Sequence, residues 1–304
     1  MDEDERGREH SCLAAGFSGR LTMNVVALLA CHNRRDLTLR CLEAFFSQTF
    51  RASAPTLGPV VVDDGSTDGT AEAVRAEFPS VQVVAGDGTL FWARGMERAE
   101  SRAIAERPDF LLWLNDDVTL AGTAVDRLLA TAVTCPDAII VGALLDPETM
   151  AVTYSGVVQS RWHPLRTRLV VTTDRPLEAD TFNGNLVLVP REIYERVGPI
   201  DGGFSHGQAD FDYGLRARKA GFRIVVAPGT VGTCRRGDKR DTFEDTTLPL
   251  KRRWQLVTSA AGLPMGSHAR YLRRHTGFLW PLYWAAPYVK LTLTALVTAP
   301  RRRS

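Results

Sequence analysis

The stretch VVVDDGSTDGT, residues 60–70, places three aspartates and two glycines directly after a run of valines. Three structures use such residues: a surface turn, in which Asp, Gly, Ser and Thr collect for conformational reasons, a calcium loop, and a nucleotide site at the edge of a sheet. In an EF-hand loop that starts at Asp64, position 12 is Arg75, where calcium requires a bidentate Glu. The calcium loop is therefore excluded, and the turn and the nucleotide site remain.

A second group of carboxylates, Asp116 and Asp117, follows Asn115 and the apolar run FLLWL. Two adjacent carboxylates in a partly dry cleft repel each other unless a cation shares them. A Mg²⁺ or Mn²⁺ that also binds a diphosphate would relieve this repulsion and stabilise a departing nucleoside diphosphate. The alternative is an N-cap for the helix that follows.

A third group, Asp210 and Asp212 in the segment HGQADFDYGLRARKAG, stands at the start of a predicted helix. A helix N-terminus favours carboxylates, so either residue can be a cap. A carboxylate that points into a cleft can instead take a proton from an attacking hydroxyl as a general base. Both roles can coexist, one in each residue.

The elements that position these residues alternate between apolar runs of strand length and helical patterns. This order predicts an α/β fold, with a Rossmann-like, mostly parallel sheet covered by helices on both faces. After residue 146 the pattern favours short antiparallel pieces, and later a helix at 210–220. The expected strands are 24–30, 59–62, 81–84, 110–114 and 138–141, and the expected helices are 36–48, 70–78, 94–107 and 123–134.

Four successive strands end in polar or small residues: CHNR, DDGSTD, GDGTLFW and NDD. Ligands of open α/β sheets bind beyond the carboxyl ends of the strands, so together these segments predict a nucleotide site. For any one segment alone, an ordinary loop with Asx and glycine turns is the favoured interpretation, and the nucleotide site is indicated by all four together. GDGTLFWARG is not a dinucleotide fingerprint, because Phe91 stands where GxGxxG needs glycine, and no GK[ST] of a P-loop is present.

Composition indicates a soluble globular protein, with 44% hydrophobic and 24% charged residues among 304. Five scattered cysteines without a CxxC pair indicate reduced thiols in the cytoplasm. The acidic opening segment, residues 1–22, lacks the pattern of a signal peptide and predicts a disordered leader.

Charge is distributed unevenly along the chain. Residues 246–304 contain ten Lys or Arg and no Asp or Glu, whereas residues 1–245 contain 27 basic against 35 acidic residues. The segment 277–300 is apolar and aromatic, and arginines flank it. This pattern favours an amphipathic helical tail lying in the plane of an anionic membrane surface. A helical hairpin packed on the catalytic body and a dimer contact are the alternatives. Nucleic-acid binding is not expected, because the aromatic residues lie outside the arginine clusters.

In this order and at these intervals, CHNR, VVVDDGSTDGT, GDGTLFWARGM, WLNDD and ADFDYGLRARKAGFRI resemble a family 2 glycosyltransferase of the GT-A fold. Within that family the chain is similar to the bacterial branch that builds cell-surface glycans, including rhamnosyl- and galactofuranosyltransferases. The resemblance implies inverting transfer of a hexosyl or deoxyhexosyl group from a nucleoside diphosphate sugar to a glycan or lipid-linked acceptor. It also implies that Mg²⁺ or Mn²⁺ assists the reaction. We expect the enzyme to lie at the cytoplasmic face of the inner membrane.

The resemblance assigns a role to individual residues. Asp210 is the implied catalytic base and Asp117 the implied metal ligand. Cys234 stands where the family often has a metal-binding histidine, and Ala209 where it often has Glu. The implied donor-binding residues are Ala30 and His32 at the base pocket, Asp64 on the base, Asp87 and Trp92 near the ribose and sugar, and Asp116 on the ribose or the metal. The expected acceptor-binding residues are Asn183, Gly184, His206 and Asp212.

The predicted organisation is a leader at 1–22, a nucleotide-sugar-binding half at 23–145, an acceptor-binding half with the base at 146–245, and a membrane-association tail at 246–304. Two other functions remain open. A nucleotidyltransferase would carry a glycine-rich phosphate loop, which CHNRRD lacks. A non-catalytic nucleotide-sugar-binding protein would keep Asp64 and Asp117 without needing Asp210.

Overall fold

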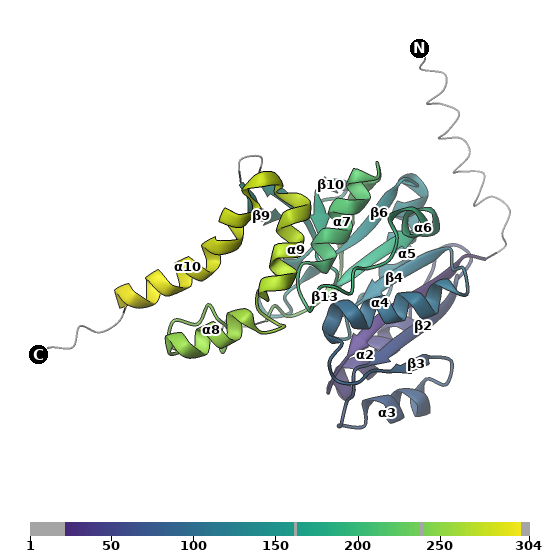
Figure 1. The fold of residues 1–304 in the computed structure, drawn as a ribbon. Helices are drawn as coiled ribbons and strands as arrows, with labels where there is room; N and C mark the ends of the chain where they lie inside the picture. The colour runs from purple at the N-terminus through teal and green to yellow at the C-terminus, as the bar shows by residue number, and fades with distance from the viewer. Residues whose placement is uncertain (1–21, 161–162, 238–239, 299–304) are drawn as a thin grey trace, which may run out of the picture.

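The computed structural model describes residues 22–160, 163–237 and 240–298, so nearly all of the predicted leader lies outside it. A large twisted sheet runs through the molecule, with strand order β10-β13-β6-β12-β4-β1-β2-β3 (Figure 1). β5 (Thr119–Leu120) pairs with β13, and β7 (Val152–Tyr154) pairs with β6. The α/β architecture expected from the sequence is confirmed.

The first half of the sheet is parallel. β1 (Asn24–Cys31) lies between β2 (Thr56–Asp63) and β4 (Phe110–Leu114), and β3 (Gln82–Ala85) extends the sheet beyond β2. These strands are apolar on both faces because helices cover both sides of the sheet. Their carboxyl ends therefore meet at one edge, as the sequence predicted.

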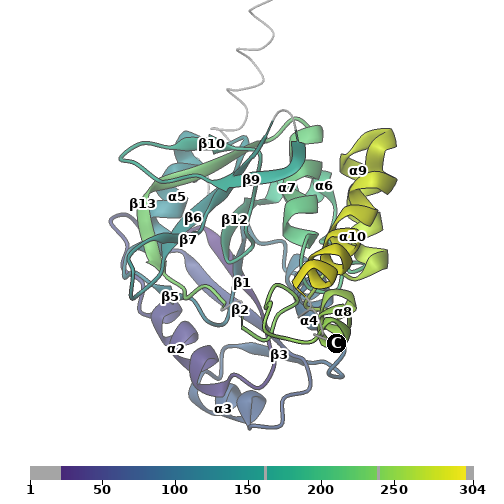
Figure 2. The same cartoon turned by 90° about the vertical axis from the view of Figure 1, so that its left-hand side faces the viewer.

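Successive residues of β1 face opposite sides of the sheet and belong to two separate cores. Val26 and Leu28 face one core, and Val25, Ala27 and Leu29 face the other. The first core is covered by α4 (Phe91–Ile104), α6 (Arg191–Val197) and α7 (Ala209–Lys219); the second is covered by α2 (Arg35–Phe46), α3 (Thr70–Glu77) and α5 (Ala124–Thr134). Figure 2 shows these two layers edge-on.

The second half of the sheet is mixed. β12 (Leu186–Pro190) runs antiparallel between β4 and β6 (Ala138–Leu145), and β13 (Arg223–Thr233) is parallel to β6. β10 (Leu177–Ala179) forms the edge. A small antiparallel sheet, β11-β8-β9, comprises Thr181–Phe182, Gly156–Ser160 and His163–Leu169. The antiparallel part expected after residue 146 is thus present.

Helix α4 begins at Phe91, three residues before the predicted start at 94. The carboxylate of Asp64, at the end of β2, accepts hydrogen bonds of 2.9 Å from the amides of Leu90 and Phe91. A helix N-terminus has amides without intrahelical partners, and here a residue 26 positions away supplies the acceptor. Local sequence carries no sign of this long-range cap.

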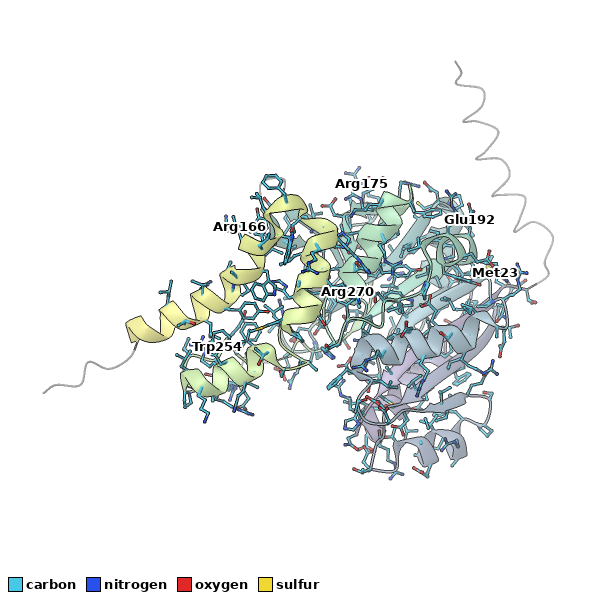
Figure 3. All side chains as sticks on the ribbon, viewed as in Figure 1. Met23, Arg166, Arg175, Glu192, Trp254 and Arg270 are labelled. Carbon is cyan, nitrogen blue, oxygen red and sulfur yellow. The ribbon has the colours of Figure 1, made fainter. Side chains whose placement is uncertain are left out.

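The tail is helical, as predicted, and contains α8 (Leu250–Thr258), α9 (Met265–His275), a 3-10 turn at Gly277–Leu279 and α10 (Trp280–Thr298). α9 packs against α7, and α10 packs against α8 and α9. Trp254 of α8 stacks on Tyr288 of α10 at 6.0 Å between ring centroids (Figure 3). No helix in the described part of the chain combines the length and the apolar character needed to cross a membrane.

Candidate functional site

Asp64 fixes the loop that follows β3. Besides Leu90 and Phe91, its carboxylate accepts a 2.8 Å hydrogen bond from the amide of Gly88. A Cβ at Gly86 would lie 2.6 Å from the same carboxylate, so only glycine fits there. Asp64 therefore positions the loop, and its predicted bond to a nucleotide base stays a prediction.

His32 and Ala30 lie at the end of β1, beside this loop. The Nδ1 atom of His32 donates a 2.6 Å hydrogen bond to the carbonyl of Asp64, which fixes the ring against the second strand. Ala30 faces α4, where a Cβ at Gly95 would lie only 2.8 Å from its own Cβ. Both residues are thus held at the sheet edge where a nucleotide base was predicted.

Arg34 lies between the two carboxylates that follow β4. Its Nη1 atom is 3.0 Å from Oδ1 of Asp116 and 3.2 Å from Oδ2 of Asp117. Burial, partly offset by Arg34, raises the pKa of Asp116 to about 6. The repulsion expected between the adjacent carboxylates is therefore balanced here by a guanidinium.

Cys234, just after β13, contacts the same pair. Its Sγ lies 3.4 Å from Oδ1 of Asp117 and 3.8 Å from the side-chain amide of Asn185. Burial, and then the charge of Asp117, raise the pKa of this thiol above its usual range. Cys234 is therefore a neutral neighbour of Asp117, at the position where the resemblance implied a metal-binding histidine.

Trp92 connects the two halves of the chain that were predicted to bind the donor and the acceptor. Its indole Nε1 donates a 2.8 Å hydrogen bond to Oδ1 of Asn115, the residue before the two aspartates. The six-membered part of the ring lies against Gly184, where a Cβ would be 2.7 Å from the indole. Asn115 and Gly184 thus both fix the ring.

Asp210 is the second side chain in contact with Gly184. Its Oδ2 accepts a 3.0 Å hydrogen bond from the amide of Gly184, and its Oδ1 accepts one of 2.9 Å from the amide of Phe211. Burial of the side chain raises the pKa of Asp210 to about 6, and the two amides oppose this rise. A carboxylate with such a pKa is ionised at neutral pH and retains enough basicity to accept a proton.

His206 and Asn183 lie near this group. His206 is exposed in the loop before α7, and desolvation, and then the charge of Arg34, lower its pKa. The amide of Asn183 donates a 3.1 Å hydrogen bond to the carbonyl of Ser155, which holds the turn that carries Gly184. Both therefore belong to the same end of the molecule as Asp210.

Two predicted site residues, Asp212 and Asp87, make their contacts outside the group formed by Asp210, Gly184 and Trp92. Asp212 is not brought together with the others, because its side chain has no exposed area and is enclosed by Arg216, Arg274 and His275. Asp87 is exposed at the loop surface and accepts hydrogen bonds from the amide and hydroxyl of Thr89 within a local turn.

A divalent cation is compatible with the donor atoms at Asp116 and Asp117. Oδ2 of Asp116 is buried and has no hydrogen-bond partner, which leaves a hard oxygen ligand available. Over the described residues, no group of three or more His, Cys, Asp or Glu side chains could hold a metal. Mg²⁺ is commonly bound by one or two carboxylates together with substrate phosphates, and two carboxylates suit that mode.

Sequence reasoning did not assign Arg34 or Asn115 to the site. Arg34 is the first cation after β1, and Asn115 is the first polar residue after β4. Their positions at two neighbouring strand ends were the signal that could have identified them.

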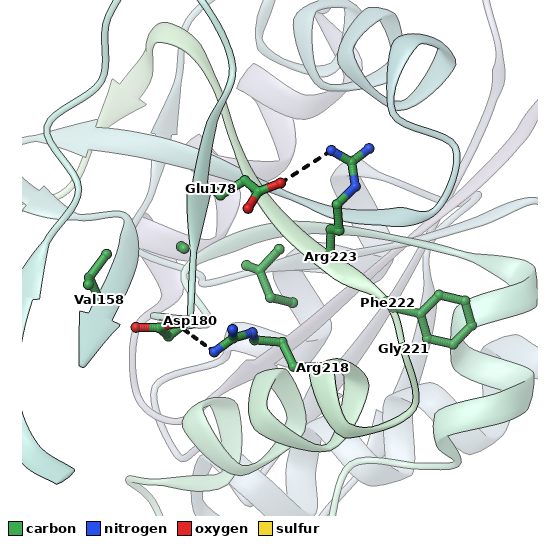
Figure 4. A pocket seen from close by; sticks show the side chains of 9 residues that line it. Val158, Glu178, Asp180, Arg218, Gly221, Phe222 and Arg223 are labelled. Carbon is green, nitrogen blue, oxygen red and sulfur yellow. Dashed lines mark hydrogen bonds and ion pairs between the residues drawn. The ribbon is translucent and has the colours of Figure 1, made fainter. Parts of the chain in front are cut away.

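A separate pocket lies at the far edge of the sheet (Figure 4). It has a volume of about 430 Å³, and Arg218 and Arg223 pair across it with Asp180 and Glu178. None of the predicted site residues lines it.

Comparison with known proteins agrees with this architecture. The chain matches the model of glycosyl transferase family 2 over residues 27–197 and that of glycosyl transferase family group 2 over residues 142–302. An N-acetylglucosaminyl-diphospho-decaprenol L-rhamnosyltransferase of Mycobacterium tuberculosis is 25% identical over 214 residues, which cover 62% of this chain and 69% of the relative.

Two solved structures share the fold. The mannosyltransferase PcManGT of Pyrobaculum calidifontis, in complex with GDP-Man and Mn²⁺, has a TM-score of 0.56 at 18% identity and covers 97% of this chain and 83% of its own. GalNAc-T7 with UDP, GalNAc and Mn²⁺ also has a TM-score of 0.56, at 14% identity, over 88% of this chain and 55% of its own. The first family model spans more than half of the chain, and the fold is GT-A: the chain belongs to glycosyl transferase family 2 and is a glycosyltransferase.

Proposed function

We propose that this glycosyltransferase moves a hexose or deoxyhexose from a nucleoside diphosphate sugar to a hydroxyl of a lipid-linked or cell-surface glycan, with inversion. The observation that carries the proposal is a continuous chain of contacts. It runs from Asp210 through Gly184 and Trp92 to Asn115, which directly precedes Asp116 and Asp117. A base and a pair of acidic donor-side residues are thus joined by direct packing.

In the proposed reaction Asp210 accepts the proton of the acceptor hydroxyl. The hydroxyl oxygen forms a bond to the anomeric carbon, while the bond from that carbon to the diphosphate oxygen breaks and its electron pair leaves with the diphosphate. A single displacement of this kind inverts the anomeric configuration. The amides of Gly184 and Phe211 keep the carboxylate of Asp210 in place for the transfer.

Asp116 and Asp117 are the residues that would hold a Mg²⁺ or Mn²⁺ ion, which when bound neutralises the negative charge of the diphosphate. Arg34 contributes a cation of this chain at the same place. The two similar solved structures both contain Mn²⁺, which supports a divalent cation here.

L-rhamnose is the first donor sugar to test, because the curated relative is a rhamnosyltransferase. The name of that relative also contains a diphospho-decaprenol, which supports a lipid-linked acceptor for this chain. Such an acceptor lies at a membrane, and we place the enzyme at the cytoplasmic face of the inner membrane. Four buried free cysteines and a tail with ten basic residues and no acidic residue support this location.

A thermal-shift screen of nucleoside diphosphate sugars, with and without Mn²⁺, tests the donor side. One class of donor should stabilise the wild type in a Mn²⁺-dependent manner, and Asp117→Ala should lose this shift. Equal shifts in the wild type and Asp117→Ala would remove Asp117 from the site. NMR of the anomeric proton of the product then tests inversion.

A further inference from the structure

Helix α10 is apolar on two opposite sides. With about 3.6 residues per turn, Trp284, Tyr288 and Leu291 fall on one side of the helix. Tyr288 and Leu291 are buried against Val257 of α8, and the indole of Trp284 donates a 3.1 Å hydrogen bond to the carbonyl of Met265 in α9. This side of α10 is therefore fully used by the protein itself.

The opposite side of α10, continued by the 3-10 turn before it, is called here the outer ridge. Its members are exposed and spaced by three or four residues, so they form one line along the helix. Leu282, Val289 and Leu293 have 53–69% of their area exposed, and Phe278 has 88%. The outer ridge consists of Phe278, Leu282, Ala286, Val289 and Leu293.

A helix that is apolar around its whole circumference is normally buried on all sides. Here α8 and α9 cover only one side, and in Figure 1 the helix extends away from the sheet. The sequence predicted an amphipathic helix in the plane of a membrane, and the structure shows which of its sides the protein leaves uncovered. α10 presents apolar side chains outward, and a contiguous exposed apolar row of this kind indicates an interaction surface.

The charge of the tail that carries the outer ridge indicates the chemistry of its partner. Arg270 and Arg274 of α9 are paired with Asp201 in the catalytic body. Lys251 and Arg252 of α8 are exposed, and the guanidinium of Arg273 lies 4.4 Å over the ring of Trp280. Residues 246–304 contain no acidic residue that would repel an anion. An exposed apolar row on a basic tail rich in aromatic rings fits a bilayer of anionic phospholipid.

We propose that the outer ridge docks in the plane of an anionic phospholipid surface and thereby brings the cleft to a membrane-held acceptor. The proposal rests on the proposed function, because a lipid-linked acceptor is what makes this placement useful. α9 lies between the ridge and the base: its Arg274 and His275 bind Asp212, two residues from Asp210. Docking would therefore fix the position of Asp210 relative to the surface.

Co-sedimentation with vesicles tests the docking without requiring turnover. The full-length wild type is mixed with phosphatidylglycerol-containing vesicles or with phosphatidylcholine vesicles, at low and high salt. The ridge variant is Leu282→Gln/Leu293→Gln. The matched control, Ile104→Gln/Val133→Gln, replaces two exposed aliphatic residues in helices α4 and α5 of the catalytic body. Thermal unfolding confirms that both variants remain folded.

The wild type and the control should sediment with anionic vesicles and be released by salt, whereas the ridge variant should bind about tenfold or more weakly. Wild type that stays in the supernatant, or a ridge variant that sediments like the wild type, overturns the proposal. Light scattering covers a further outcome: a wild-type dimer that the ridge variant loses, without vesicle binding, would show that a second copy covers the ridge.

These outcomes are independent of the proposed function. Vesicle binding uses neither donor nor acceptor, so its failure leaves the donor-binding test untouched. Conversely, an enzyme that binds vesicles but none of the sugar donors would contradict the proposed function and leave the docking surface intact.

Discussion

The amide of Gly184 donates a 3.0 Å hydrogen bond to the carboxylate of Asp210. Gly184 also lies against the ring of Trp92, so a single residue without a side chain contacts both the proposed base and Trp92. A side chain at this position would push the two apart. This arrangement makes specific predictions for the pH dependence of the reaction and for substitutions around the base.

The acid limb of the pH–rate profile should reflect Asp210, whose pKa is raised to about 6. The base works only when it is deprotonated, so kcat/KM should fall as the pH drops through about 6, by about tenfold per unit below it. His206 is a second titratable group of the predicted site, and its pKa is lowered. His206→Gln is therefore the control. This variant should keep the limb; a limb that disappears with His206 would show that Asp210 is not the titrating group.

Gly184→Ala should reduce transfer by about tenfold to a hundredfold, because misplaced reacting groups lose rate steeply. The added Cβ would lie 2.7 Å from the ring of Trp92 and 3.2 Å from Cβ of Asp210, so the two side chains must separate. Gly122→Ala is the matched control, since a Cβ there meets nothing within 4 Å. Steady-state kinetics of both variants test this prediction. Equal transfer rates would show that the spacing between Trp92 and Asp210 at Gly184 is unimportant.

Arg34→Ala should make the stability of the protein depend more strongly on a bound divalent cation. Without Arg34, the adjacent carboxylates of Asp116 and Asp117 lose their counter-charge, which should destabilise the free enzyme by about 1–2 kcal/mol, since Arg34 is half exposed. Mn²⁺ should then raise the Tm of the variant more than that of the wild type. Arg51→Ala, which removes a more exposed pair with Asp126, is the control. Identical Mn²⁺ shifts in all three proteins would contradict cation binding by this pair.

Asp212 should contribute to stability and not to substrate binding. Although burial alone would raise its pKa, the hydrogen bond from His275 and the charges of Arg216 and Arg274 hold the pKa at about 2, below the ordinary 3.8. The ionised carboxylate of Asp212 therefore contributes about 2 kcal/mol to the free energy of unfolding above about pH 4. This contribution is lost as the pH falls toward 2.

Denaturant unfolding tests this contribution. Asp212→Asn should lower the free energy of unfolding at neutral pH, and the gap to the wild type should narrow in acid. The control is Glu106→Gln, which removes a surface pair with Arg102 and should change stability little. A gap that does not depend on pH would show that the charge of Asp212 is not what stabilises the cluster.

Local patterns were sufficient for the central sheet. β1, β2 and β4 are apolar runs because both faces of a parallel sheet are covered, and such runs are visible in sequence. The convergence of four polar strand ends then follows from strand direction alone. Asp116 and Asp117 could be selected in this way, whereas Asp210 was selected as a carboxylate at a predicted helix start and through the family resemblance.

Long-range contacts could not be read from the same patterns. The early start of α4 depends on Asp64, and the enclosure of Asp212 depends on Arg274 and His275, which are more than 60 residues away. Asp210 and Asp212 are two positions apart and have similar local sequence, yet α9 covers only one of them. The tail supplies the covering helix: it was predicted as a membrane element, with packing on the catalytic body as an alternative, and the contact to Asp212 depends on that packing.

The central claim is that Asp210 is the base of a glycosyl transfer, and the most direct measurement compares wild type with Asp210→Asn. With the donor found in the thermal-shift screen and a lipid-linked acceptor, single-turnover transfer should slow by about a hundredfold to ten-thousandfold, while donor affinity stays unchanged. Transfer at nearly the wild-type rate would contradict the account and remove Asp210 as the base.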